Sequence, residues 1–144
     1  MEVKTTTALD SPIHQDSIQI RTHVFVKEQH VPADLEVDKD EGKATYFVLY
    51  DAGLPVATAR ILPEANGYHV QRVAVEKIYR KHGLGKMVLT AIIKYARQHH
   101  VSFLKLGAQI QAVGFYKTLG FQLTNRPEFL DAGIRHREMM LKLD

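Results

Sequence analysis

The sequence contains no cysteine in its 144 residues. Disulfides, thiolate metal sites and cysteine nucleophiles are therefore excluded, and any covalent intermediate would need another residue. Long apolar runs are also lacking, because no stretch approaches the roughly 20 residues that cross a bilayer. The opening segment MEVKTTTALD does not have the basic and then apolar pattern of a signal peptide. We therefore expect a cytoplasmic protein without a membrane partner.

A strong charge of one sign is lacking as well. The 19 basic and 16 acidic side chains leave a net charge of +3, which suits a small anionic ligand but is too weak for a nucleic-acid coat. The basic residues are not interleaved with aromatic residues, and no helix-turn-helix connection is present, so we expect no nucleic-acid partner. The eight histidines include no H-x-x-x-H or H-E-x-x-H pattern, so we expect no metal.

Repeats, low-complexity tracts and linker-like shifts in composition are absent, which indicates one domain over residues 1–144. Ser11 and Pro12 predict the start of a helix, because serine favours the N-cap and proline the first helical position. The polar, acidic segment 26–43 predicts a long connection. Apolar runs over 44–75 predict three strands of an antiparallel meander, with turns at Asp51–Gly53 and Asn66–Gly67.

The second half of the chain alternates between helical and β-type patterns. After the segment RKHGLGK (80–86), apolar residues recur every three or four positions over 84–96, which predicts an amphipathic helix. A strand over 102–108, a helix over 112–120 that ends at Gly120, and strands over 121–124 and 134–143 follow. With a Thr-rich strand over 3–7 in front, this order predicts a mixed α/β fold.

The segment RKHGLGK places two glycines where a β-type run gives way to a helix. The first helical turn has free N–H groups and the positive end of the helix dipole, so a glycine-rich entry can hold an anion. Gly83 and Gly85 would let a phosphate approach the backbone, with Lys77, Arg80, Lys81 and Lys86 around it. A tight turn with solvated cations is the alternative. The phosphate signatures GxxxxGK[ST] and GxGxxG are both absent.

These motifs together resemble the GNAT superfamily of acetyl-CoA-dependent N-acetyltransferases. The strand RVAV (72–75) precedes Arg80-x-x-Gly83-x-Gly85, and FYKTLGF (115–121) follows later in the chain. Four further segments are similar to the ElaA-like branch of small bacterial members: VFVKEQHVP (24–32), LEVDKDE (35–41), LGAQIQAVGFY (106–116) and PEFLDAGIRHREM (127–139). The resemblance implies a GNAT fold of the α/β (α+β) class, with a mixed central sheet of about six to seven strands, splayed in the middle, and about four flanking helices.

The resemblance also implies which residues hold acetyl-CoA. Backbone groups of the splayed strand would pair with the pantetheine arm, and main-chain amides of the glycine loop would hold the pyrophosphate. Gln109 stands where the family often has an asparagine that faces the cofactor. The expected cofactor-binding residues are Val73, Ala74, Val75, Arg80, Lys81, His82, Gly83, Leu84, Gly85, Lys86, Gln109 and Tyr116.

Tyr116 matches the tyrosine that protonates the departing CoA thiolate in many relatives. The alternative for Tyr116 is core packing, which we expect of its neighbours Phe115, Leu119 and Phe121. The thioester oxygen would be polarised by a backbone N–H of Val73 or Ala74.

An alkyl amine has a pKa near roughly 10, so a base must take its proton. Of the acidic residues in the connection, we select Glu28 as a catalytic residue because it lies at the end of the first helix, beside the acceptor groove that the resemblance implies. His136 is a second candidate, with a structural histidine as its alternative. The remaining polar candidates could form a substrate pocket, helix caps or a solvated face: Glu36, Asp38, Asp40, Glu41 and His69.

Three classes of function follow. The first is an N-acetyltransferase that acylates a primary amine of a small-molecule or peptidic substrate by direct attack in a ternary complex, which needs no covalent intermediate on the enzyme. The second is a non-catalytic sensor that binds acyl-CoA, and the third is a nucleic-acid-binding module that uses the basic helix entry. The resemblance also allows a homodimer.

Overall fold

The computed structural model describes residues 1–33 and 38–144, and Glu36 lies outside these ranges. The strands are β1 (Glu2–Thr6), β2 (Thr45–Asp51), β3 (Leu54–Glu64), β4 (Gly67–Val75), β5 (Phe103–Gln109), β6 (Gln122–Leu123), β7 (Phe129–Asp131) and β8 (Ile134–Lys142). The α-helices are α1 (Pro12–Arg21), α3 (Leu84–Gln98) and α4 (Val113–Thr118). A π-helix, η1 (Thr22–Glu28), continues α1, and short 3₁₀ turns are η2 (Glu41–Lys43), η3 (Lys77–Tyr79) and η4 (Ile110–Ala112).

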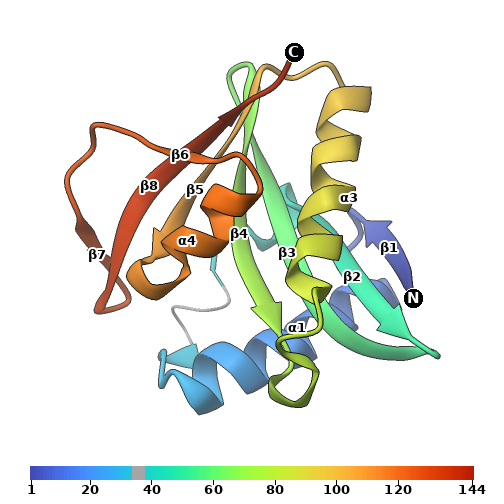
Figure 1. Cartoon of the computed structure of the whole chain (residues 1–144). Helices are drawn as coiled ribbons and strands as arrows, with labels where there is room; N and C mark the ends of the chain where they lie inside the picture. Colours follow the sequence, from blue (N-terminus) through green and yellow to red (C-terminus); the bar gives the residue numbers. More distant parts are fainter. Residues whose placement is uncertain (34–37) are drawn as a thin grey trace.

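The strands form one mixed sheet in the order β1-β2-β3-β4-β5-β8-β6, with β7 paired to β8 (Figure 1). The strands β2, β3 and β4 form the expected antiparallel meander, and β4 and β5 run parallel. The predicted mixed α/β fold is therefore confirmed. The sheet is slightly wider than expected, with eight strands in the described part of the chain.

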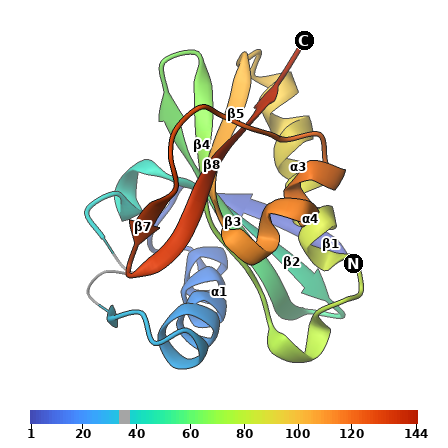
Figure 2. The ribbon, with the colours of Figure 1, turned by 60° about the vertical axis from the view of Figure 1, so that its left-hand side comes forward.

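Helices cover both faces of the sheet (Figure 2). Alternate residues of a strand point to opposite faces, so a strand between two helical layers is apolar on both sides. In β2, Phe47 and Leu49 join the core beneath α3 and α4, whereas Val48 joins the core beneath α1. All three side chains are at most 1% exposed.

The first helix begins as the sequence predicts. The Ser11 hydroxyl accepts a hydrogen bond from the N–H of Ile13 at 3.1 Å, and Pro12 occupies the first turn, where its missing N–H costs nothing. The helical segment extends further than expected, because η1 continues it as far as Glu28. The connection predicted from residue 26 therefore begins after this point, and Glu28 lies at a helix end as expected.

The sheet opens between β4 and β5. The two strands pair only from Gly67 with Phe103 to Val70 with Leu106, and beyond these residues no β4–β5 pair is formed in the described structure. The register of β3 and β4 shifts between Thr58 and Arg60, so one β3 residue faces two β4 residues. Arg72 has a φ of 56° in this bulge. A bulge bends its strand and increases the local twist, which turns the end of β4 away from β5.

The strand β7 was not predicted from the sequence. It pairs with β8 across a tight turn in which Ala132 and Gly133 both have positive φ, 51° and 77°. The turn between β2 and β3 has the same geometry, with φ of 49° at Ala52 and 83° at Gly53. Two positive φ values are typical of a type I′ turn, whose twist matches that of the strands it joins.

Candidate active site

A cavity of about 1000 Å³ follows the opening between β4 and β5. It runs from the start of α3 to the β7–β8 hairpin. It is lined by all but one of the expected cofactor-binding residues, the exception being His82. The structure thus brings together segments that lie far apart in the sequence: the end of β4, the loop before α3, the end of β5 and α4.

The N-terminus of α3 forms one end of this cavity. Gly83 is the N-cap residue, with φ of 76° and ψ of 14°, and no described side chain caps the first turn of the helix. The amides of Leu84, Gly85 and Lys86 therefore carry the positive end of the helix dipole without a side-chain acceptor. The described structure shows no ion pair of Lys81 or Lys86. This end of the cavity can hold an anion.

Arg80 and Glu28 form an ion pair beside this loop. The guanidinium of Arg80 donates to both carboxylate oxygens of Glu28, at 2.9 and 2.8 Å, and its Nε donates to the carbonyl of Val75 at 3.0 Å. Arg80 therefore ties the end of η1 to the end of β4. Glu28 itself does not line the cavity. Its predicted role as the base stays a prediction.

The open edge of β4 presents main-chain groups to the cavity. The N–H of Glu76 donates to the carbonyl of Val56 at 2.9 Å, so the neighbouring pair Ala57–Val75 is of the non-hydrogen-bonded kind. The N–H of Val75 consequently points away from β3. By the same alternation, the main-chain groups of Ala74 point toward β3, so the N–H of Ala74 does not face the cavity.

Two aromatic residues of α4 lie along the cavity. Tyr116 is 7% exposed, and burial raises the pKa of its phenol, which therefore stays protonated at neutral pH. No described side chain forms a hydrogen bond with its hydroxyl. Phe121 is buried in the core as expected, but Phe115 is 36% exposed and lines the cavity. The expectation of a core position for Phe115 is therefore wrong.

Gly85 explains where Phe115 lies. A Cβ atom on Gly85 would stand 3.3 Å from the ring of Phe115, closer than such contacts normally are. The glycine thus allows α4 to pack its aromatic ring against the first turn of α3, and it also leaves the amide of that turn uncovered. The second glycine of the motif has a packing role that the sequence did not indicate.

The other end of the cavity has a polar floor. Paired residues in neighbouring strands point to the same face of a sheet. Lys105 of β5 pairs with His69 of β4, and Gln109 pairs with His136 of β8. These residues, together with Glu138, line the cavity on the α1 face, whereas Leu104, Leu106 and Ala108 face the apolar core under α4. Burial lowers the pKa of His69, which favours its neutral form.

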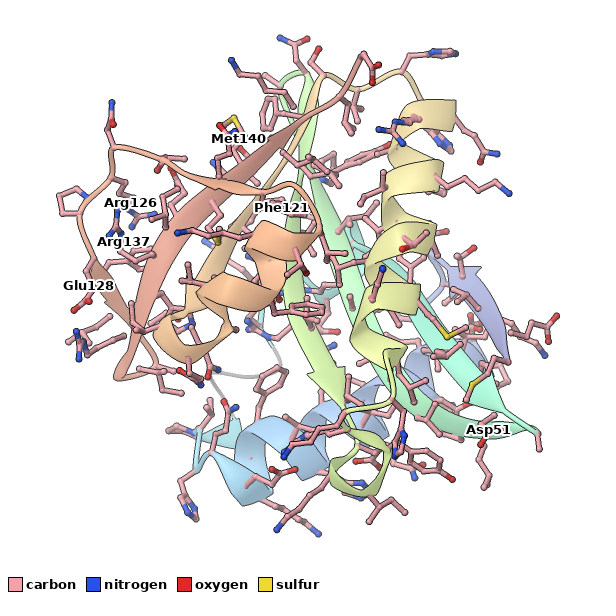
Figure 3. All side chains as sticks on the ribbon, viewed as in Figure 1. Asp51, Phe121, Arg126, Glu128, Arg137 and Met140 are labelled. Atoms are coloured by element: carbon pink, nitrogen blue, oxygen red, sulfur yellow. The ribbon has the colours of Figure 1, made fainter. Side chains whose placement is uncertain are left out.

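The loop before β7 and the β7–β8 hairpin complete this end of the cavity, and Figure 3 labels Arg126 and Glu128 in this loop. The guanidinium of Arg126 lies 3.8 Å from the ring centroid of Phe129 and 3.4 Å from the carboxylate of Glu138. Gly107 provides the space for Phe129, since a Cβ atom there would stand 2.9 Å from the ring.

A buried charge cluster stands behind the cavity wall. Glu41 accepts hydrogen bonds from Arg21 and Arg60, both 0% exposed, and from the hydroxyl of Tyr46 at 2.6 Å. His14 lies 3.0 Å from the same carboxylate. Burial alone would raise the pKa of Glu41, but the bonds from Arg21, His14 and Tyr46 outweigh it and lower this pKa to about 2.

The cluster reaches the cavity through Asp38. Arg60 donates to both oxygens of Asp38, at 3.2 and 3.0 Å, and to the side-chain oxygen of Gln71. Arg72 lies 3.3 Å from Asp38. Asp38, Gln71 and Arg72 all line the cavity. Glu41 therefore does not belong to a solvated face, because it neutralises buried arginines, whereas Asp38 binds Arg60 and also accepts from the N–H of Asp40 at 3.0 Å. Asp40 lies near Lys43 instead, at 3.9 Å.

Comparison with known proteins assigns the family. The acetyltransferase (GNAT) domain profile matches residues 9–143. The chain is 40% identical over 126 residues to the uncharacterized N-acetyltransferase YjcF of Bacillus subtilis, which is 88% of this chain and 90% of that protein.

Solved structures agree with this assignment. The crystal structure of Escherichia coli ElaA has a TM-score of 0.86 at 25% identity and covers 98% of this chain and 99% of its own. The CoA-dependent acyl-homoserine lactone synthase BjaI, solved with SAM and isopentyl-CoA, shares the fold, with a TM-score of 0.81 at 14% identity over 99% of this chain and 83% of its own.

The described residues include no helix that is long and apolar enough to span a membrane. The fold, the two motifs around the open sheet edge and the relatives agree with one another. The chain belongs to the GNAT acetyltransferase family.

Proposed function

We propose that the protein transfers an acetyl group from acetyl-CoA to a primary amine of a small-molecule or peptidic substrate. The observation that supports this most directly is one continuous cavity. It joins the uncapped first turn of α3 to the open edge of β4 and then to the polar floor of the sheet. A cofactor end and an acceptor end are thus connected across the opening between β4 and β5.

The residues at the cofactor end fit coenzyme A. The position of a Cβ on Gly83 has no neighbouring atom within 4 Å, so a phosphate could approach the backbone there. The amides of Leu84 to Lys86 would hold the pyrophosphate, with the free side chains of Lys81 and Lys86 beside it. Bound acetyl-CoA would supply an activated acyl group, and the N–H of Val75 would hold its pantetheine arm against β4.

Tyr116 would supply the proton that the leaving sulfur needs. Its phenol is kept protonated by burial and it lines the same cavity as the open edge of β4. Of the two expected donors, Val73, which lies in the bulge of β4, would donate its N–H to the oxygen on which charge develops. Direct attack by the amine requires no nucleophile on the protein.

Two measurements separate the transferase from the alternatives. Calorimetric titration with CoA should show saturable binding, because a nucleic-acid module would not bind it. Acetyl-CoA with a panel of primary amines should then release free thiol at a rate that depends on the amine. Saturable binding of CoA without amine-dependent turnover would instead favour the acyl-CoA sensor, and lack of CoA binding would contradict both.

Substitution of Gly83 by valine tests whether the start of α3 holds the pyrophosphate of CoA. We expect Gly83→Val to weaken CoA binding about 10- to 100-fold, because the loss of a charge-assisted hydrogen bond costs about 1.5–3 kcal/mol. Valine also strains a backbone that has positive φ. Gly53→Val is the matched control, since Gly53 has a φ of 83°, open space around it and no place in the cavity. Equal CoA affinity in the two variants would contradict the assignment.

A further inference from the structure

The two ring nitrogens of His136 have different environments. Nδ1 lies 2.7 Å from the carbonyl oxygen of Ile134. A carbonyl oxygen can only accept a hydrogen bond, so Nδ1 carries the proton of the neutral ring and Nε2 keeps its lone pair. No described residue forms a hydrogen bond with Nε2. The side chain is 8% exposed and lines the cavity, so this nitrogen is a positioned proton acceptor.

The orientation of the ring is fixed by its neighbours. Phe129 stacks on it, with ring centroids 5.6 Å apart and planes 22° from parallel. The Cδ2 atom, which adjoins Nε2, faces β5, because a Cβ on Gly107 would lie 3.8 Å from it. The bond from Nδ1 to Ile134 prevents the ring from turning over without loss of a hydrogen bond.

His136 stands at the opening of the sheet. It pairs with Gln109 at the end of β5, beyond the last residue that pairs with β4. It belongs to the polar face of the sheet, whereas Tyr116 on α4 lies on the opposite face. The two side chains therefore approach the opening from opposite faces, which is the arrangement that direct transfer needs between an entering amine and a departing thiol.

We propose that His136 is the general base that takes the proton from the acceptor amine, an inference that rests on the proposed transfer reaction. The amine nitrogen forms a bond to the acyl carbon, and its N–H electron pair stays on nitrogen as the proton passes to Nε2. The C–S bond breaks with its electron pair on sulfur, which takes the proton of Tyr116. Solvent then returns a proton from His136 to Tyr116, so the products are an amide and free CoA.

Of the other titratable groups at this end of the cavity, Asp131 is exposed to solvent beside the β7–β8 turn, and the rest have partners or lie away from the opening. Asp38 is held by Arg60, and Glu138 accepts from Thr124 at 3.0 Å and lies 3.4 Å from Arg126. His69 lies within the paired part of β4 and β5, before the opening. Glu28 is held by Arg80 outside the cavity lining. The geometry therefore points to His136.

Replacement by asparagine removes the base and can keep the bond to Ile134, because the Asn side-chain nitrogen can take the place of Nδ1. We expect His136→Asn to lower kcat for amine acetylation about 100-fold. CoA affinity, measured by titration, should stay within about twofold of the unsubstituted protein, since His136 does not belong to the cofactor end.

His99 offers a matched control outside the cavity. Its Nδ1 lies 2.8 Å from the carbonyl of Tyr95, and its ring stacks on that tyrosine at 4.0 Å, so it shares the chemistry of His136. His99→Asn should leave kcat and CoA affinity unchanged. Both variants lose one imidazole, so a lower kcat in His136→Asn alone would indicate a role of His136 at the reacting centre.

Nitrogen-15 NMR of the histidine rings gives a readout that does not depend on turnover. At a pH where the ring is neutral, the signals lost in His136→Asn should show a protonated Nδ1 and an unprotonated Nε2. The opposite tautomer would overturn the proposal, because Nε2 could not then accept a proton.

The kinetic outcomes also distinguish the two levels of inference. If the unsubstituted protein acetylates an amine and His136→Asn does so equally well, His136 is not the base although the proposed function stands. A large loss in Glu28→Gln with none in His136→Asn would assign the base to Glu28 and would likewise overturn the proposal. If no amine is acetylated by the unsubstituted protein, the transfer reaction and the base fail together.

Discussion

Replacement of Glu41 by glutamine is expected to lower the free energy of unfolding by about 3–5 kcal/mol, the cost of removing one partner of a buried ion pair. Arg21 and Arg60 are both fully buried, and the carboxylate of Glu41 accepts a hydrogen bond from each of them. Glutamine keeps the size of the side chain but removes its charge. The two buried guanidinium groups would then lose the charged carboxylate that they share, while Asp38 still accepts from Arg60.

Urea denaturation followed by circular dichroism measures this loss, and Glu128→Gln provides the control. Glu128 accepts two hydrogen bonds from Arg135 of β8 at 2.8 and 2.9 Å, but this pair lies at the surface; Figure 3 labels Glu128 in the loop before β7. Water screens such a pair, so its loss should change the unfolding free energy little. Equal stability of the two variants would show that Glu41 does not compensate the buried arginines.

Acid should reproduce the effect of the substitution. The folded protein lowers the pKa of Glu41 from 4.5 to about 2, so the contribution of Glu41 is complete above its unfolded value. It is lost as the pH falls from 4.5 toward 2. Burial alone would raise the pKa of Asp38, but the hydrogen bond and charge of Arg60, the N–H of Asp40 and the charge of Arg72 together lower it, so the contribution of Asp38 is lost in the same direction. Glu41→Gln should therefore lose less stability than the unsubstituted protein on acidification.

The buried charge cluster around Glu41 could not be predicted from the sequence. The segment LEVDKDE could be recognised as acidic, but its charge pattern alone did not reveal two arginines from distant elements beneath it. Arg21 is on α1 and Arg60 on β3, and only the packing of α1 on the sheet brings both to Glu41. Residues that interact across the fold leave no local period in the sequence, whereas helices and strands do.

The proposed cofactor end could be located in the sequence for the opposite reason. Its parts are local: a strand, a glycine N-cap and an amphipathic helix follow one another within residues 67–98, and each has its own pattern. The strand β7 could also have been found, because the triplet Asp-Ala-Gly that marks the turn at residues 51–53 occurs again at 131–133. The position of Phe115 could not, since it depends on the contact between α4 and Gly85.

The residues of the proposed acceptor end were the hardest to identify from the sequence. Its residues come from β4, β5, β8 and the loop before β7, and each is an ordinary polar residue within its own strand. His136 could be singled out as a candidate, but the ring orientation on which its proposed role as base rests depends on the carbonyl of Ile134 and the ring of Phe129. Such a property follows from three-dimensional packing and not from residue type.

The largest expected loss of activity is that of Tyr116→Phe. We expect kcat for amine acetylation to fall about 100- to 1000-fold, the range typical of a lost general acid. The ring packs edge-on against Phe115 at 5.1 Å and Phe121 at 5.8 Å, and phenylalanine keeps both contacts, so the fold should survive. CoA affinity should change little, because the hydroxyl acts on sulfur only as the bond to carbon breaks.

Tyr68→Phe is the matched control, since Tyr68 packs against the same core but does not line the cavity. A packing role for Tyr116 would predict that both variants behave alike, and that a ring-fluorinated tyrosine at position 116 behaves like tyrosine. A role as acid predicts instead that fluorination, which makes the phenol more acidic, changes the rate of thiol release while leaving the stability unchanged. Because burial raises the pKa of this phenol, the proton is present at neutral pH in either case. The rate of thiol release therefore reports how readily Tyr116 gives up its proton. A rate that fluorination does not change would show that Tyr116 does not act as the acid.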